Sequence, residues 1–239
     1  MSSSIFSQST VIDIILGTIV IIVSLLSLSF YLQILKIFYT QKTRFGTNAY
    51  RLMFQMGLTD CLQLFFHTFG GIFSIANSTF NDTFNKICGG FLNSGWIVSI
   101  FFTLLLAFNR FSTLCFRHKT ILFENLFLFN TQIFISWLYF GIYFVIYMTP
   151  YCSVLYDPIN LSWGYDNSEW SRTIEKIELY ATLIQLSLTG ILYLFIIFWL
   201  LTTKQYAENV SREYKQEFKV LIQVSSFRTF PRMADSNGF

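Results

Sequence analysis

Five long apolar stretches dominate this sequence. A bilayer hydrocarbon core of about 30 Å takes about 20 helical residues to cross, and each stretch is at least that long. Residues 14–28 in the first stretch are apolar on every face, whereas strands of a membrane barrel alternate apolar and polar residues. The sequence therefore predicts an all-α membrane protein with five spanning helices, at residues 11–38, 49–76, 88–116, 126–149 and 177–203.

The amino-acid composition agrees with a multi-pass membrane protein in contact with lipid. The chain is 54% hydrophobic and 12% charged, which leaves too few charges to cover a water-soluble globule. No basic residue precedes the first span and no clear cleavage site accompanies it, so we expect that span to stay as a signal anchor.

The basic residues indicate the orientation. The loops on one side of the membrane carry only Lys86, Arg172 and Lys176. Since lysine and arginine are enriched in cytosolic loops, the N-terminus is expected outside and the C-terminus in the cytosol. The net charge of +3 follows from this bias, and no nucleic-acid partner is expected. The predicted cytosolic set is Lys36, Lys42, Arg44, Arg51, Arg110, Arg117, Lys119, Lys204, Arg212, Lys215 and Lys219.

Asparagines in Asn-x-Ser/Thr motifs test this orientation. Asn77, Asn81 and Asn160 begin such motifs in loops predicted to be external, and they are candidate glycosylation sites. Asn209 begins a fourth motif on the cytosolic side, where no glycan is added. Three of the four motifs therefore agree with the predicted topology.

Two of the four cysteines face the oxidising side of the membrane. Cys88 begins the third span and Cys152 lies in the external loop after the fourth, so a disulfide between them is predicted; two unpaired thiols are the alternative. Cys61 lies inside the second span, where packing as a free thiol is expected. Cys115 adjoins a basic cytosolic run and is a candidate for palmitoylation.

A carboxylate lies inside the second span. An ionised aspartate at the centre of a membrane helix costs about 3 kcal/mol, so Asp60 is expected to face the bundle or a polar cavity. It either binds a cation or a proton, or forms hydrogen bonds to neighbouring helices, and the second interpretation is favoured. Asn93 and Trp96 in the third span, with Trp137 in the fourth, either bond and pack between helices or line a ligand cavity.

Residues for other chemistry are scarce. The chain has two histidines, no Cys-x-x-Cys pair and no Gly-rich phosphate loop, so neither an enzyme nor a metal or cofactor site is expected. A sixth apolar span begins at Phe218, but residues 228–235 include two arginines, a proline and an aspartate and cannot continue it through lipid. We expect residues 1–224 to form an incomplete receptor-like domain and residues 225–239 a polar cytosolic tail in place of the sixth and seventh helices.

Several segments taken together resemble a known family. Residues 45–60, Cys88, the triplet Asn109-Arg110-Phe111, Trp137 and residues 151–163, which contain a Cys-x-x-x-Tyr-Asp-Pro loop ending in tryptophan, look like the nematode serpentine chemoreceptors. The likeness is strongest to class x, with class t as a near neighbour. It covers about the first 220 residues in order.

The resemblance implies a seven-helix receptor in the ciliary or dendritic plasma membrane of a sensory neuron. Such a receptor detects a small molecule and couples to a heterotrimeric G protein, with Arg110 as the cytosolic arginine of the switch. Asn109 occupies the place of an acidic residue, so the resting hold on Arg110 is expected to be weaker or supplied elsewhere. Asp60 would be the polar centre of the second helix, and Cys88 with Cys152 the external disulfide.

Three functions follow from these patterns. The first is an orphan chemosensory receptor, present here as a truncated form unable to signal alone. The second is a non-signalling membrane protein that associates with full-length receptors of the same family and regulates them. The third, a channel or transporter subunit, has the least support, because the intramembrane charge is confined mainly to Asp60.

Overall fold

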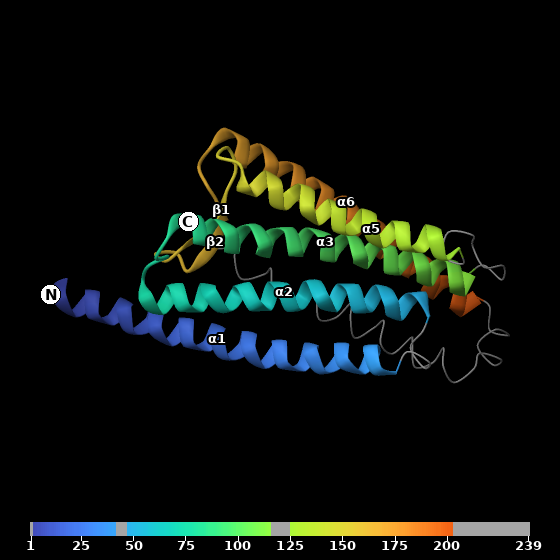
Figure 1. Ribbon diagram of the computed structural model, residues 1–239, viewed down its shortest axis with the longest axis horizontal. Helices are drawn as coiled ribbons and strands as arrows, with labels where there is room; N and C mark the ends of the chain where they lie inside the picture. The colour runs from blue at the N-terminus through green and yellow to red at the C-terminus, as the bar shows by residue number, and fades with distance from the viewer. Residues whose placement is uncertain (1, 42–46, 116–124, 203–239) are drawn as a thin grey trace. The chain divides into compact units, whose positions relative to one another are not determined.

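The computed structural model describes residues 2–41, 47–115 and 125–202, and the side chains among them from residue 11 to residue 200. Helices make up nearly all of this part of the chain, as an all-α membrane protein requires. They are α1 (Ser2–Thr40), α2 (Asn48–Ala76), α3 (Asp82–Cys115), α5 (Leu126–Met148) and α6 (Glu169–Thr202), with strands β1 (Val154–Asp157) and β2 (Ser162–Tyr165) between α5 and α6 (Figure 1).

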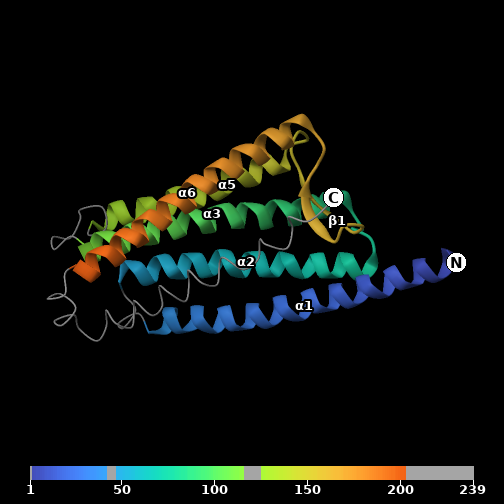
Figure 2. The ribbon, with the colours of Figure 1, turned by 180° about the vertical axis from the view of Figure 1, so that it is seen from behind.

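Four helical segments in the described part of the chain are long and apolar enough to cross a membrane. They are Val11–Thr40, Asp82–Cys115, Leu126–Met148 and Glu169–Leu200. The remaining helix, α2, has 29 residues and is therefore about 44 Å long, which is sufficient to cross. The polar residues of α2 lower its hydropathy below that of the other four helices. Helix α2 lies between α1 and α3, and these neighbouring helices shield its polar residues from lipid (Figures 1 and 2).

Three helices begin earlier than the apolar stretches predict. Helix α1 begins at residue 2 rather than 11, α3 at 82 rather than 88, and α6 at 169 rather than 177. The predicted edges were wrong because apolarity marks the part of a helix in lipid, whereas its first turns can be polar. Local caps set two of these ends: Asn81 Oδ1 accepts a hydrogen bond from the backbone N–H of Phe84, and Ser168 Oγ accepts one from Ser171.

Helices α1 and α2 approach each other through glycine. A Cβ atom added at Gly17 would lie 2.6 Å from the carbonyl oxygen of Gly71, and one added at Gly71 would lie 2.7 Å from that of Gly17. Farther along, Leu35 covers Gly57. Small residues at a membrane helix interface let two backbones pack closely, and that packing holds α1 against the bundle.

The loop after α5 forms an antiparallel hairpin, which was not predicted from the sequence. Val154 pairs with Tyr165 and Asp157 pairs with Ser162. The turn is closed by Asp157, whose Oδ1 accepts from the backbone N–H of Ile159 at 2.9 Å. The hairpin lies at the same end of the bundle as the end of α2 and the start of α3 (Figures 1 and 2).

The chain divides into two compact units, residues 1–193 and 194–239. The site described below lies in the first unit. In the second, the structure describes only the end of α6, which is helical to Thr202. The predicted sixth span from Phe218 and the predicted tail at residues 225–239 lie outside the described residues.

Candidate functional site

Four polar side chains meet around one carboxylate near the hairpin end of the first unit. Asn93 comes from α3, Tyr147 from α5, Tyr165 from β2 and Glu178 from α6, and we refer to them as the Glu178 cluster. The hydroxyl of Tyr147 donates to Glu178 Oε1, and the hydroxyl of Tyr165 donates to Glu178 Oε2. Asn93 Nδ2 lies 2.7 Å from each tyrosine oxygen and 3.0 Å from Glu178 Oε2. One carboxylate thus connects three helices and the hairpin.

The cluster is buried among aromatic residues. Tyr147 is fully buried and Glu178 is 8% exposed. Burial, followed by the charge of Glu178, raises the pKa of Tyr165 above its ordinary value, so its phenol stays protonated and remains a hydrogen-bond donor. Three further aromatic side chains pack in the apolar cluster that contains Tyr147: Trp96, Tyr139 and Tyr143.

Of the two residues predicted to line a ligand cavity, Asn93 is a member of the Glu178 cluster and Trp96 packs in the adjoining apolar cluster. Tyr147, Tyr165 and Glu178 were missed. A signal for Glu178 was present, because it is the second residue of the predicted fifth span. Helix α6 thus carries a second carboxylate within a helix long enough to cross a membrane.

The hairpin covers the α2–α3 side of the bundle. Tyr156 packs against Phe73 and Cys88, and its hydroxyl shares a hydrogen bond with Ser74. The side chain of Asn85 holds β1 by its backbone: Tyr156 N–H donates to Asn85 Oδ1 at 2.8 Å, and Asn85 Nδ2 donates to the Tyr156 carbonyl at 3.1 Å. An amide side chain on α3 thus pairs with β1 much as a neighbouring strand would.

All four cysteines are free thiols. Cys88 is buried with Phe73 and Tyr156, whereas Cys152 is buried with Tyr143 and Tyr147. The two sulfurs thus lie in two different apolar clusters, and the structure does not confirm the predicted disulfide. Cys61 and Cys115 are partly buried thiols; palmitoylation of Cys115 stays a prediction.

The polar residues in the middle of the bundle bond between helices. Ser99 Oγ on α3 donates to Asp60 Oδ1 on α2 at 3.4 Å. Trp137 Nε1 on α5 donates to Gln55 Oε1 on α2 at 2.9 Å. These contacts agree with the favoured interpretation of Asp60 and with the bonding interpretation of Trp137, and they explain how α2 carries polar groups inside a bundle.

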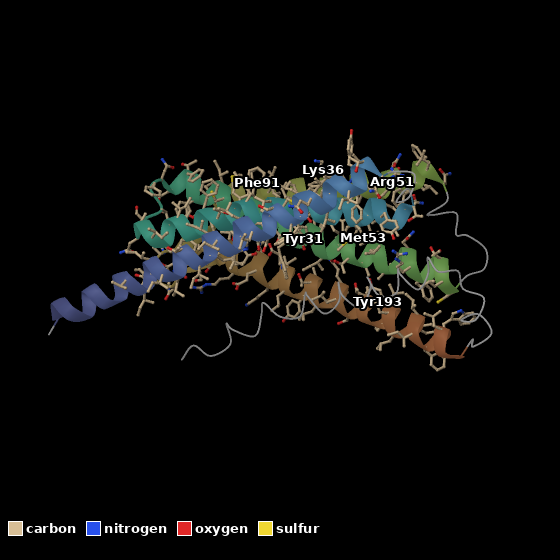
Figure 3. The ribbon with its side chains drawn as sticks, turned by 90° about the horizontal axis from the view of Figure 1, so that it is seen from below. Tyr31, Lys36, Arg51, Met53, Phe91 and Tyr193 are labelled. Carbon is tan, nitrogen blue, oxygen red and sulfur yellow. The ribbon has the colours of Figure 1, made fainter. Side chains whose placement is uncertain are left out.

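The triplet Asn109-Arg110-Phe111 lies near the end of α3, at the opposite end of the bundle from the hairpin. Asn109 and Arg110 are each 4% exposed, and Phe111 is partly buried. Another arginine, Arg51 on α2, connects α2 to α5 at this same end of the bundle. Figure 3 shows Arg51 and Phe91 well separated along the bundle. The Nη2 of Arg51 donates to Asn130 Oδ1 at 2.7 Å, and its guanidinium lies 4.7 Å from the centre of the Phe129 ring.

The candidate glycosylation sites lie at the hairpin end. Asn77, Asn81 and Asn160 are all exposed. Asn77 ends α2 in the left-handed conformation, with φ 46°, and Asn81 caps α3. Asn160 lies in the hairpin turn, where its Nδ2 donates to Asp157 Oδ2 at 2.7 Å. Glycosylation at these sites stays a prediction.

Membrane-length helices, an arginine buried near the end of the third and a hairpin between the next two are consistent with a serpentine receptor of the G-protein-coupled type. The family model for the serpentine type 7TM GPCR chemoreceptor Srt matches residues 2–235. The chain belongs to this family. Comparison with individually curated proteins finds no match.

The family match confirms the resemblance to serpentine chemoreceptors and corrects its class. The matching class is Srt, which is class t, whereas the motifs in the sequence resembled class x most strongly. Membership places the chain among multi-pass membrane receptors and not among enzymes. A G protein and a small-molecule ligand are the partners that this type of receptor has in general.

Proposed function

We propose that the chain is an orphan chemosensory receptor that detects a small environmental molecule and couples to a heterotrimeric G protein through Asn109-Arg110-Phe111. The family match over residues 2–235 carries this proposal. The plasma membrane of sensory cilia or dendrites is the proposed location, with the N-terminus outside. The charge bias of the loops supports this orientation.

The surroundings of Arg110 suggest how coupling is controlled. Its side chain is 4% exposed, so a G protein reaches it only after the helices around it move. Asn109 precedes it where the resemblance leads us to expect an acidic residue. An amide carries no negative charge and forms no ion pair with a guanidinium, and Asn109 therefore holds the resting state less firmly than a carboxylate would.

We further propose that this form does not signal by itself. The observation behind this is the run of residues 228–235, whose charges and proline do not continue a sixth helix through lipid. In the proposed receptor the sixth helix opens the G-protein cleft. An alternative is that this form binds full-length receptors of its family and regulates them. Failure to recover any such receptor by co-immunoprecipitation would exclude that alternative.

The test is a second-messenger assay in cells. The chain is expressed as it stands and as a fusion in which helices six and seven of another Srt receptor follow residue 224. A panel of volatile and water-soluble small molecules is applied to both. We expect a response from the fusion alone, and Arg110→Ala should abolish it, because the switch arginine is lost.

Arg172→Ala is the matched control, since Arg172 is an exposed arginine at the hairpin end of α6. This variant should respond like the unmutated fusion. A fusion that responds equally well with Arg110→Ala would refute the coupling role. A response from the chain without the added helices would refute the proposal that this form cannot signal alone.

A further inference from the structure

The carboxylate of Glu178 is held by neutral groups. Its three hydrogen-bond donors within the described residues are two phenols and an amide. Lys86, the basic residue at this end of α3, directs its Nζ to the carbonyl of Thr149 at 2.5 Å instead. Arg172 and Lys176 on α6 are exposed. A carboxylate that is 8% exposed therefore has no positive partner in the part of the chain that the structure describes.

Both oxygens of the Glu178 carboxylate accept hydrogen bonds. An ionised carboxylate accepts only, whereas a protonated carboxyl group must also place its own hydrogen. Tyr147 and Tyr165 both donate to Glu178, and Asn93 has two N–H hydrogens to share among its three acceptors. Oxygen Oε2 has two donors and Oε1 has one, so Oε1 keeps room for a further donor.

Aromatic rings lie beside this carboxylate. The ring centres of Tyr147 and Tyr165 are 6.3 Å apart, and those of Tyr143 and Tyr147 are 6.1 Å apart. A cation within about 6 Å of a ring centre is attracted by the ring face, and aromatic rings are a common feature of sites that bind ammonium groups. Asn93, Trp96 and Tyr165 are partly exposed, so the cluster is not fully enclosed.

We infer that the Glu178 cluster binds the ammonium group of a small organic amine. The inference rests on the proposed receptor function and names the chemical class of its ligand. The ligand's N–H donates to Glu178 Oε1, and its charge balances the carboxylate against the faces of Tyr147 and Tyr165. An uncompensated buried charge is costly, so the cation stabilises the arrangement of α3, α5, α6 and the hairpin around it.

The test uses the whole chain purified in detergent at pH 7, with butylammonium as the probe and 1-butanol as its neutral counterpart. Butylamine is fully protonated at this pH, and the two molecules differ mainly in charge and in the number of donated hydrogens. Thermal unfolding is followed by tryptophan fluorescence over a range of probe concentrations. We expect butylammonium to raise the melting temperature and 1-butanol not to raise it.

Two variants locate the effect. Glu178→Gln keeps the shape of the side chain and removes its charge, so affinity for butylammonium should fall by at least about tenfold, which is about 1.4 kcal/mol. Glu169→Gln is the matched control, since it makes the same charge change at an exposed position on the same helix. It should bind like the unmutated chain.

Three results would overturn the inference: equal stabilisation by both probes, no stabilisation by either, or unchanged binding in Glu178→Gln. The comparison of the two probes needs no variant, so it decides the matter even if Glu178→Gln fails to fold. Binding is measured without a G protein. A failed inference therefore leaves Arg110-dependent signalling untouched, and failed signalling leaves the binding result intact.

Discussion

A single methyl group at Gly89 should displace the hairpin. The backbone of β1 crosses α3 at this point, and a Cβ atom at Gly89 would lie 2.0 Å from the carbonyl oxygen of Val154. Carbon and oxygen approach no closer than about 3.3 Å, so Gly89→Ala moves the hairpin by about 1.3 Å. That shift stretches both hydrogen bonds between Asn85 and the Tyr156 backbone, now 2.8 and 3.1 Å long.

The expected loss can be estimated from three terms. Overpacking costs about 1–3 kcal/mol, and each weakened hydrogen bond costs about 1 kcal/mol more. Alanine returns about 1 kcal/mol, because it favours a helix more than glycine does. We therefore expect Gly89→Ala to lower the free energy of unfolding by about 2–4 kcal/mol, measured by thermal unfolding in detergent with tryptophan fluorescence.

Gly141→Ala in α5 is the matched control. No atom lies within 4 Å of the Cβ position there, so only the helix preference of alanine acts. This variant should be more stable than the unmutated chain by up to about 1 kcal/mol. The two substitutions are chemically identical and should shift the melting temperature in opposite directions. If both raise it equally, the close packing of β1 on Gly89 is refuted.

Two further predictions concern single polar contacts. Burial alone would raise the pKa of Asp166, but hydrogen bonds from Ser171 and Ser168 lower it below its ordinary value. The stability that the ionised Asp166 carboxylate gives the folded chain is therefore complete above the unfolded pKa of about 3.9. It disappears as pH falls through the lower pKa of the folded state. Between pH 5 and 3 the free energy of unfolding should fall further for the unmutated chain than for the Asp166→Asn variant. Parallel curves of stability against pH for the two proteins would contradict this. Trp137→Phe leaves Gln55 without its donor and should cost about 1–3 kcal/mol in thermal unfolding, whereas Trp170→Phe, at an exposed position, should cost nothing measurable.

The helices could be predicted from the sequence because lipid imposes a simple demand. A backbone in hydrocarbon must bond to itself, so a long apolar run such as residues 126–149 is a helix whatever its neighbours. The ends of α1, α3 and α6 were not predictable in the same way. Their first turns lie outside the apolar stretches, and caps such as Ser168 decide where they begin.

The hairpin and the Glu178 cluster depend on partners distant in the sequence. Each strand is only four residues long, and β1 is held by Asn85, which lies 71 positions before Tyr156. Nothing local distinguishes such a loop from an irregular one. Asn93 was predicted because it is polar inside a long apolar span, whereas Glu178 lies near the edge of its stretch, where a carboxylate is common.

The two attachments of the hairpin are linked through β1 and β2. Asn85 and Gly89 fix β1 on α3, and the register pairs Val154 with Tyr165, the residue that donates to Glu178. A displacement of β1 at Gly89 therefore moves Tyr165 relative to α6. Gly89→Ala should then weaken butylammonium binding as well as stability, although Gly89 itself belongs to neither the cluster nor its aromatic surroundings. Gly141→Ala should leave binding unchanged. If Gly89→Ala destabilises the chain and binding stays the same, the hairpin covers the bundle without positioning the site.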